Sequence, residues 1–391
     1  MIVLRRALLL AVLAAVAACA SPAAAQAGTV KVMTRNLDLG ADLTPATRAG
    51  SLQQLVDAAG VILGQVDEND FRMRARGLAA EILRTKPDLV GLQEAALWRT
   101  APCTENPLPP KASQVRYDYL RLLLDRLNAG ARRYRLVVSQ DEFDFEVYVN
   151  SDGNASTSAP SCPLGSELNG RLTMRDAILA RRGRVTTSRA RGGHFKTLLQ
   201  VRPGGVAIDV TRGWTRVDAR VPGAPPFRFV NTHLEAFDNQ PSNHTNQGTD
   251  VGNGQIREAQ AKELAARGGP ARTGRRVILV GDLNSDVATE VKPGDGLAYR
   301  ALLRRGFAER STDRPLSCCL KADVLTTAGG GSRGDFDHQV DHVMTSAPGT
   351  VRLIRSAVTG LAPVNGFWSS DHAGVFSSLR VFAAARPRFT G

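Results

Sequence analysis

The chain has 391 residues and a formal net charge of +13. That length is enough for one large domain or two average ones with an ample core. A basic surface attracts phosphate-bearing polymers and anionic membranes, but the Arg residues are scattered along the chain and do not form one stripe. The net charge is therefore compatible with nucleic acid or an anionic membrane as a partner, and it does not exclude other classes of partner.

The first residues have the pattern of a secretory leader. Arg5 and Arg6 precede an apolar run from Ala7 to Ala18, and small residues follow it. The apolar run is too short to span a bilayer comfortably, which disfavours a permanent transmembrane helix. We therefore predict a signal peptide over residues 1–27, a single domain over residues 28–391 and an exported protein, either secreted or periplasmic.

A second interpretation of the leader stays open. The run Val16-Ala17-Ala18-Cys19 resembles the lipobox of bacterial lipoproteins, in which the cysteine is acylated and becomes the mature N-terminus. The protein would then be lipid-anchored through Cys19. The Ala-rich stretch after Cys19 offers its own cleavage site, after Ala25 or Ala27, and this favours free secretion.

The first part of the mature chain combines strands and helices. Alternating apolar and polar residues predict a strand over 29–36. Apolar residues at helical spacing predict a helix over 71–84, which Pro87 follows. A second buried strand is then predicted over 88–94, and an amphipathic helix over 117–127.

The rest of the chain is rich in predicted strands. Short apolar runs bounded by turn residues predict strands over 135–139, 143–149, 176–181, 195–201, 206–210, 214–221, 227–234, 277–282, 340–345 and 372–381, and one helix is predicted over 255–266. Helices early and late, with hairpins between them, predict a single α/β (α+β) domain with two packed sheets.

Three polar stretches are predicted as loops. Residues 98–113 and 150–169 show no pattern that would place them in the core, and 239–254 is polar and Gly-rich. The last of these follows a candidate site residue, His233. We therefore expect a lid or a substrate loop there.

Four cysteines lie beyond the leader. An even number in an exported protein indicates disulfides. We prefer a pair between Cys103 and Cys162, because both lie in polar, Pro-rich sequence. The neighbours Cys318 and Cys319 form either a vicinal bridge or two thiols, and the sequence leaves both open. No CxxC or His-rich spacing accompanies them, so a zinc site is not expected.

The most informative segment runs from Arg276 to Asn284. Four consecutive apolar residues predict a strand that is buried on both faces. Gly281 then lets the backbone turn, and Asp282 and Asn284 follow one residue apart. Alternation along an extended chain puts these two side chains on the same side. A carboxylate and an amide are therefore held together at the end of a rigid strand.

Other predicted strands also end in polar side chains. These ends are Asn36, Gln93-Glu94, Asn231-Thr232-His233, Asp282 with Asn284, Asp341-His342 and Ser370-Asp371-His372. Any one of them alone would be explained as an ordinary turn or surface residue. Together, carboxylates and carboxamides at strand tips suit a hard cation such as Mg²⁺, which takes oxygen ligands and keeps several waters.

With these stretches, the chain resembles the endonuclease/exonuclease/phosphatase superfamily, the group with the deoxyribonuclease I-like fold. The matching stretches are Thr34-Arg35-Asn36, Leu92-Gln93-Glu94, Asn231-Thr232-His233-Leu234, Gly281-Asp282-Leu283-Asn284, Val340-Asp341-His342 and Ser370-Asp371-His372, in the family's order over residues 30–382. The resemblance implies a four-layer sandwich of two packed mixed β-sheets flanked by helices. It also implies cleavage of a phosphate ester with one or two divalent metal ions, Mg²⁺ or alternatively Mn²⁺.

The resemblance also implies roles for matched residues. Glu94 would be the main metal ligand, with Asn36 and Asp371 close to the ion. The implied catalytic residues are His233 at the scissile phosphate or the leaving oxygen, Asp282 at the attacking water, Asn284 at the phosphorane oxygens, His372 at the phosphate or the water, and Asp341 as the partner that fixes the tautomer of His372.

One position departs from the family pattern. Where many members have a Gly- or Asn-rich stretch before a central strand, this chain has Arg175 and Asp176. Arg175 would either bind a substrate phosphate or pair with Asp176, and both interpretations stay open.

The leading functional prediction is an exported, metal-dependent phosphodiesterase that acts on nucleic acid. A sphingomyelinase-like or phosphoinositide-directed hydrolase with a phospholipid substrate is an alternative. A non-catalytic binding module is a third, which the complete set of charged site residues disfavours. No obligate protein partner is implied, and we expect a monomer.

Overall fold

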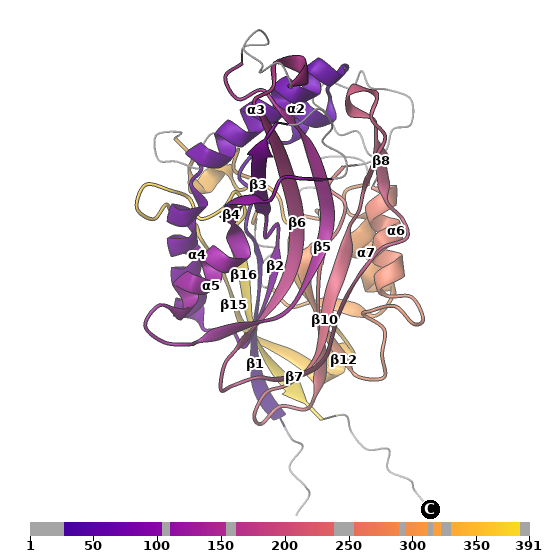
Figure 1. The fold of residues 1–391 in the computed structure, drawn as a ribbon. Coiled ribbons are helices and arrows are strands. Elements are labelled where there is room, and N and C mark those ends of the chain that lie inside the picture. Colours follow the sequence, from indigo (N-terminus) through magenta and orange to yellow (C-terminus); the bar gives the residue numbers. More distant parts are fainter. Residues whose placement is uncertain are drawn as a thin grey trace, which may run out of the picture.

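The computed structural model describes residues 27–103, 110–153, 162–237, 254–288, 294–311, 316–321 and 330–383. Nearly all of the predicted leader, Cys19 included, and the loop over 239–254 except its last residue lie outside these ranges. In the described part of the chain, no helix is long and apolar enough to cross a membrane. Two large sheets lie face to face, with helices on both outer sides (Figure 1).

The first sheet has eight strands. Its order is β15 (Val351–Thr359), β16 (Gly374–Phe382), β1 (Ala27–Asn36), β2 (Leu89–Gln93), β6 (Leu168–Arg181), β3 (Leu97–Pro102) and β4 (Gln114–Asp118), and β5 (Tyr134–Val149) also pairs with β6. Strands β1 and β2 are parallel, and the other pairs are antiparallel.

The second sheet has six strands. Its order is β13 (Phe307–Glu309), β14 (Asp341–Ser346), β12 (Arg276–Asp282), β11 (Phe227–His233), β10 (Gly213–Arg220) and β7 (Thr186–His194). Here β11 and β12 are the parallel pair. A separate hairpin joins β8 (Leu199–Val201) to β9 (Ile208–Val210).

Helices cover the outer faces of both sheets. Figure 1 shows α4 and α5 on one side of the molecule and α6 and α7 on the other. The helices are α2 (Thr44–Thr47), α3 (Leu52–Glu68), α4 (Phe71–Thr85), α5 (Tyr119–Asn128), α6 (Gln255–Leu264) and α7 (Leu297–Arg304), and short 3₁₀ turns lie at Pro163–Gly165, Pro203–Gly205, Arg333–Asp335 and Pro348–Thr350.

Three apolar cores separate the four layers. Between the sheets, Val32 of β1 and Ile178 of β6 pack in one cluster with Phe229 of β11 and Val280 of β12. A second cluster joins the first sheet to α3, α4 and α5, and a third joins the second sheet to α6 and α7. Central strands are buried on both faces for this reason. The predicted four-layer sandwich of two mixed sheets flanked by helices is confirmed.

Several predicted elements need correction. The stretch 98–113 is not all loop, because β3 occupies its start and Trp98 is buried in the core. The strands over 135–139 and 143–149 are one strand, β5, which is bent at two register shifts. Of the strand predicted over 195–201, only β8 forms.

Helix α3 was not predicted at all. Its start has a clear signal, since the Ser51 side chain accepts a hydrogen bond from the backbone N–H of Gln54 and caps the helix. Gly60 and Gly64 lie in its middle, and glycine weakens a helical pattern. Packing of the apolar face of α3 against the first sheet stabilises the helix despite this low propensity.

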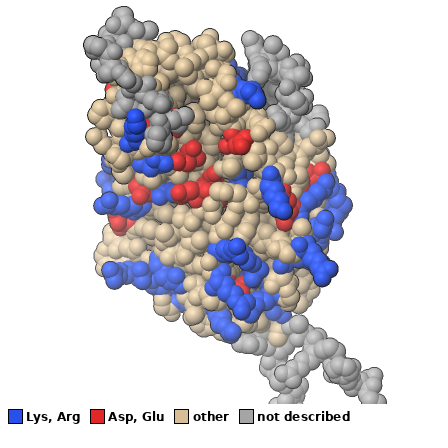
Figure 2. All heavy atoms as spheres, turned by 45° about the vertical axis from the view of Figure 1, so that its right-hand side comes forward, with Lys and Arg blue, Asp and Glu red and all other residues tan. Residues whose placement is uncertain are grey.

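The surface charge is dispersed. On the face that Figure 2 shows, Lys and Arg side chains lie in several separate groups, with Asp and Glu side chains among them. A single basic stripe of the kind that tracks a nucleic-acid backbone is not seen on this face. The fold thus agrees with the scattered Arg residues of the sequence.

Candidate active site

Strand register brings the predicted site residues together. Across the second sheet, His233 of β11 is paired in register with Asp282 of β12, and Asp282 is paired with Asp341 of β14. On the facing sheet, Asn36 of β1 is paired with Gln93 of β2. Asn36, Gln93, His233 and Asp282 are the last residues of their strands, and Asp341 is the first residue of the antiparallel strand β14. All five therefore lie at one edge of the sandwich, where rigid backbone sets their positions.

A polar bridge locks the two sheets together beneath this edge. The Asn231 amide nitrogen of β11 donates to the carbonyl oxygen of Leu92 in β2 at 3.0 Å. Gln93 in turn donates to Asn231 Oδ1. Because all three residues are buried, these hydrogen bonds fix how the strand ends of one sheet are positioned relative to those of the other.

His372 and Asp341 form a buried pair. His372 Nδ1 lies 2.8 Å from Asp341 Oδ2, and the Ser317 hydroxyl donates to the same oxygen at 2.7 Å. Burial lowers the pKa of His372, but Asp341, Asp371 and Asp282 together outweigh it and raise the pKa well above its ordinary value. The carboxylate of Asp341 therefore holds the imidazole in one orientation, with Nε2 directed away from it.

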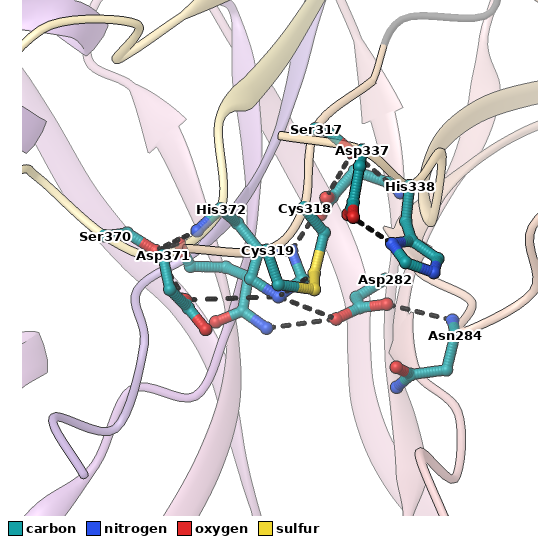
Figure 3. Close-up of a disulfide and its surroundings, with 12 residues drawn as sticks. Asp282, Asn284, Ser317, Cys318, Cys319, Asp337, His338, Ser370, Asp371 and His372 are labelled. Atoms are coloured by element: carbon teal, nitrogen blue, oxygen red, sulfur yellow. Dashed lines mark hydrogen bonds and ion pairs between the residues drawn. A yellow bond between two sulfur atoms is a disulfide. The ribbon is translucent and has the colours of Figure 1, made fainter. Parts of the chain in front are cut away.

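Asp282 lies between the two imidazoles. Its Oδ2 atom is 3.4 Å from His233 Nε2 and 3.7 Å from His372 Nε2, and it accepts a hydrogen bond from Asn36 Nδ2 at 3.0 Å. Its Oδ1 accepts from the backbone N–H of Asn284 at 2.9 Å. Burial raises the pKa of Asp282 above its ordinary value. Figure 3 shows Asp282 with Asn284 and His372 around it.

His233 is oriented by a buried arginine. Its Nδ1 lies 3.1 Å from a terminal guanidinium nitrogen of Arg212. The Nε atom of the same arginine lies 3.5 Å from Glu235 Oε2. Arginine only donates hydrogen bonds, so Nδ1 of His233 accepts and the proton sits on Nε2, facing Asp282. Burial, and next the charge of Arg212, lowers the pKa of His233 well below its ordinary value.

Glu94 and Asp371 form an acidic cluster with Asp38. Glu94 Oε2 accepts from the backbone N–H of Leu39 at 2.8 Å, and Oε1 lies 4.0 Å from His233 Nε2. Burial, followed by the charge of Asp38, raises the pKa of Glu94, and the same two causes raise the pKa of Asp371 well above its usual range. Clustered carboxylates of this kind match the oxygen donor set of Mg²⁺.

A second group could also hold a cation. One ligand atom each from Asp282, Asp341 and His372 lies within 4.8 Å of the others. A cation there would compete with the hydrogen bonds that Asp341 Oδ2 accepts from Ser317 and His372. The carboxylates of Glu94 and Asp371 take no part in either of these two hydrogen bonds.

Two predicted site residues are engaged elsewhere. Arg175 Nε donates to the carbonyl oxygen of Ala95 at 2.8 Å, and its guanidinium pairs with Asp118 at 2.5 Å. Arg175 therefore pairs with Asp118 and not with Asp176, and it joins β6 to the start of α5. Binding of a substrate phosphate by Arg175 stays a prediction. Asn284 donates through Nδ2 to the carbonyl oxygen of Leu234 at 2.9 Å, which leaves one amide hydrogen for a ligand.

Sequence reasoning missed several residues of the site. Asp38 follows the first strand at a positive φ of 56° and pairs with Arg74 at 3.2 Å. Arg212 precedes β10. Ser317 lies outside the strands and is distant in sequence from Asp341, the residue to which it donates a hydrogen bond. No local motif marks Arg212 or Ser317, whereas the Asp two residues after Asn36 could have been noticed as one more strand-tip carboxylate.

The cysteines are arranged differently from the preferred pairing. Cys318 and Cys319 are joined by a disulfide, and Cys318 Sγ lies 3.4 Å from His372 Nε2. Within the described residues, no disulfide joins Cys103 to Cys162, and their side chains are hydrogen-bonded to each other. The preferred Cys103–Cys162 bridge is therefore not formed, and of the two alternatives left open for Cys318 and Cys319 the structure has the vicinal bridge.

A large cleft opens from the acidic cluster. Its volume is about 1370 Å³, and Glu94, Arg212 and Asp371 line it together with Cys319. Apolar side chains form much of the remaining wall, among them Leu55 and Ile62 of α3, Phe143, Phe145 and Val147 of β5 and Leu172 of β6. The wall of the cleft therefore combines charged side chains with many apolar ones.

Comparisons with known proteins identify the architecture. The model of the Endonuclease/Exonuclease/phosphatase family matches residues 62–372. A crystal structure of a family member from Bacteroides thetaiotaomicron aligns over 91% of this chain and 99% of its own, with 14% identity and a TM-score of 0.51. At that identity the likeness shows the fold alone.

Two further solved structures are similar at lower scores. A mannosyl-6-phosphatase from Bacteroides thetaiotaomicron covers 90% of this chain and 99% of its own, with 14% identity and a TM-score of 0.48. The D. rerio TDP2 complex with a single-strand DNA product covers 90% and 99%, with 16% identity and a TM-score of 0.47. No curated protein matches the chain in sequence.

Proposed function

Because this chain belongs to the endonuclease/exonuclease/phosphatase family, we propose that it is an exported, divalent-metal-dependent phosphodiesterase. Members of the family are phosphoester hydrolases. The observation that carries the proposal is the position of Asp282 between two imidazoles, 3.4 Å from His233 Nε2 and 3.7 Å from His372 Nε2. The oxygens of Glu94 and Asp371 lie beside this group.

Diester cleavage needs neutralised charge, an aligned nucleophile and a protonated leaving oxygen. Asn36, Glu94 and Asp371 would hold a Mg²⁺ ion, or alternatively Mn²⁺, which supplies charge neutralisation when bound. Asp282 would orient the attacking water and accept its proton, because its raised pKa makes it a better base than an exposed carboxylate.

The two histidines suit different tasks. His372, whose pKa is raised, would donate from Nε2 to a phosphate oxygen, and Asp341 would keep it charged and oriented. His233, neutral with its proton on Nε2, would donate a hydrogen bond from Nε2 to the leaving oxygen and stabilise the charge that develops there. Asn284 would donate its second amide hydrogen to the developing phosphorane oxygens.

Nucleic acid is the proposed substrate, and the net charge of +13 supports it by favouring polyanions. The shape of the cleft favours a second candidate, a phospholipid such as sphingomyelin. Its apolar wall, with Phe143 and Leu172, would contact an acyl chain while the phosphate lies at Glu94 and Asp371. We expect a monomer in both cases.

The first test is hydrolysis of bis-p-nitrophenyl phosphate against p-nitrophenyl phosphate, with Mg²⁺, Mn²⁺ or EDTA. We expect metal-dependent cleavage of the diester, and a loss of at least ~10²-fold in Asp282→Asn because the base is removed. Asp125→Asn, on the exposed face of α5, is the matched control and should cleave at the wild-type rate. Preference for the monoester would contradict the proposal and indicate a phosphatase. No cleavage of either by a folded, Mg²⁺-stabilised protein would indicate a binding module.

A second test separates the two substrates. Cleavage of single-stranded DNA or RNA should fall steeply as salt rises from 50 to 200 mM, by roughly 10-fold or more, because contacts with several phosphates are screened. Cleavage of sphingomyelin vesicles should change much less over the same range. The substrate with the higher kcat/KM at low salt is the one that we assign to the cleft. Cleavage of nucleic acid that does not change with salt would contradict the nuclease assignment.

Export is proposed from the leader and has its own test. The intact mass of the protein recovered from expressing cells should correspond to cleavage after Ala25 or Ala27. A lipidated N-terminus at Cys19 would instead place the protein in the membrane fraction, and Cys19→Ser would release it. A full-length mass in the cytosol would contradict export.

A further inference from the structure

The disulfide of Cys318 and Cys319 occupies a position that the catalytic proposal does not use. It lies beside the side chains of Asp282 and Asp371 (Figure 3). Cys318 is buried, whereas Cys319 is exposed and lines the cleft. A small reductant that enters the cleft can therefore reach one of the two sulfurs.

The two sulfurs and His372 are close enough to share one ion. The Sγ atoms and one ring nitrogen of His372 all lie within 4.8 Å of one another, and Cys318 Sγ is 3.4 Å from Nε2. Zinc binds sulfur at about 2.3 Å and imidazole nitrogen at about 2.0–2.1 Å, so the ligand atoms of one tetrahedral ion lie about 3.6–3.8 Å apart. Small side-chain movements are enough to bring the three atoms to one centre.

Hydrogen bonds from neighbouring residues hold His372 and the two cysteines in position. His372 Nδ1 is hydrogen-bonded to Asp341, which leaves Nε2 as the ligand atom, the usual pattern of a carboxylate–histidine–metal triad. The segment of the cysteines is held by backbone hydrogen bonds between Cys318 and His338 and from Leu320 to Asp371. The sulfurs therefore stay beside His372 whether or not they are bonded to each other.

We propose that Cys318, Cys319 and His372 form a binding site for a thiophilic divalent cation, Zn²⁺ or a similar ion, when the disulfide is reduced. An external dithiol would transfer two electrons and two protons to the S–S bond, giving two thiols, and would itself become a cyclic disulfide. Binding of Zn²⁺ then releases the two thiol protons, because thiolates are the ligands. The disulfide form has no thiolate and does not bind the ion.

This site differs in chemistry from the oxygen cluster at Glu94 and Asp371. Soft thiolate ligands select Zn²⁺ over Mg²⁺, whereas carboxylates suit Mg²⁺. Occupation of the sulfur site takes Nε2 of His372 away from a substrate phosphate. The ion would therefore inhibit hydrolysis under reducing conditions only, and this consequence depends on the proposed function, whereas the binding site does not.

The binding test uses the full chain with the other cysteines replaced. Cys19→Ser/Cys103→Ser/Cys162→Ser leaves Cys318 and Cys319 as the only cysteines of the five. The protein is reduced with a phosphine, which is oxidised to its phosphine oxide, and is desalted without air. It is then titrated with Co²⁺ in excess Mg²⁺. We expect a thiolate-to-cobalt charge-transfer band that saturates at one equivalent and disappears when Zn²⁺ is added. The unreduced protein should show no band.

Variants identify the ligands. Cys319→Ser should abolish the two-thiolate band, and His372→Gln should weaken Co²⁺ binding by at least ~10-fold. His194→Gln, an exposed histidine hydrogen-bonded to Gln140, is the matched control and should bind as the parent does. Far-UV circular dichroism checks that each variant is folded. No band in the reduced, folded parent would overturn the proposal, and so would a band that His372→Gln leaves unchanged.

The activity test is independent of the binding test. In the same background, micromolar Zn²⁺ should lower the rate of diester hydrolysis by at least ~10-fold after reduction and leave the unreduced enzyme unaffected. Equal inhibition of both forms would place the inhibitory ion elsewhere and contradict the proposed consequence. If neither form cleaves a diester, the proposed function fails, while the cobalt band still decides whether the metal site exists.

Discussion

His233 and His372 lie on either side of Asp282, and their surroundings shift their pKa values in opposite directions. Arg212 adds to burial at His233, so that ring is neutral at pH 7. Three carboxylates outweigh burial at His372, so that ring is charged. Titratable groups whose environments separate their pKa values are typical of acid–base sites. Arg212, Asp282 and Asp341 are remote in sequence from the histidine whose pKa they shift, whereas Asp371 is the residue next to His372.

The first prediction at the residue scale concerns His372. His372→Ala should lower kcat for a diester by at least ~10²-fold, because it removes the charged hydrogen-bond donor to the phosphate. His194→Ala is the matched control, since its side chain is 44% exposed. His194→Ala should unfold close to the wild-type temperature, whereas His372→Ala should unfold at a lower temperature because it leaves the buried Asp341 carboxylate without its charged partner. Near-normal turnover of folded His372→Ala would exclude the mechanism.

The second residue-scale prediction concerns pH and the metal. The pKa values of Glu94 and Asp371 are raised in the metal-free fold. The folded state therefore binds protons more tightly than the unfolded state, and this contribution to stability is lost as pH rises through the raised values. A cation replaces those protons, so the gain in melting temperature on adding Mg²⁺ should be larger at pH 7.5 than at pH 5.

The size of this effect can be estimated. Mg²⁺ at 100 times its dissociation constant adds about 2.7 kcal/mol to the free energy of unfolding. Calorimetry of wild type and Glu94→Gln at both pH values measures it. The variant should gain little from Mg²⁺ at either pH. An equal gain in wild type and variant would remove Glu94 from the ligand set.

At the scale of elements, the site depends on strand register. A shift of one residue between β11 and β12 would separate His233 from Asp282 and turn each to the opposite face. Gly281 permits the close pairing, because a Cβ atom there would lie 2.1 Å from the carbonyl oxygen of Thr232. The apolar run before Asp282 sets this register by burying alternate side chains in the two cores.

Helix α3 gives an element-scale prediction with an internal control. A Cβ atom at Gly60 would lie 1.7 Å from the backbone oxygen of Asn150, whereas one at Gly64 has no atom within 4 Å. Gly64→Ala should therefore stabilise the protein by about 0.5–1 kcal/mol, through the lower entropy of the unfolded chain. Gly60→Ala should destabilise it by about 1–3 kcal/mol, since backbone must move. Urea unfolding of both variants measures the difference, and the same sign for both would contradict the packing of α3 on this segment.

At the scale of the molecule, the two sheets share one core. Residues from β1, β2, β6 and β16 of the first sheet contact residues from β10, β11, β12 and β14 of the second in a single cluster. Strands β1 and β16, from opposite ends of the described chain, are neighbours in the first sheet. Neither sheet can bury its inner face without the other.

This shared core predicts one cooperative unfolding transition. Far-UV circular dichroism and tryptophan fluorescence should report the same midpoint in urea, as expected for a single domain over residues 28–391. Trp98 lies in the core between the first sheet and its helices, and Trp214 contacts the core between the second sheet and its helices. Trp368 lies in a smaller cluster, so tryptophan fluorescence reports on several layers of the molecule. Two separated midpoints would show that the halves of the sandwich unfold independently.

The sequence by itself determined the strand tips and the class of fold. Buried strands ending in Asn36, Glu94, His233 and Asp282 are visible because burial on both faces produces continuous apolar runs, and a turn after each run exposes a polar residue. The same local logic failed at α3, where two glycines obscure the helical pattern, and at β3, where Arg99 and Thr100 follow the buried Trp98.

Only the tertiary structure decided which side chains meet. Arg212 acts on His233, Ser317 holds Asp341, and Cys318 lies against His372, although no spacing in the chain links the members of these pairs. Arg175 shows the converse, since its partner is Asp118 and not its sequence neighbour Asp176. Local patterns reflect the backbone and its burial, whereas pKa values, tautomers and a shared metal site depend on distances between segments that pack together only in the complete sandwich.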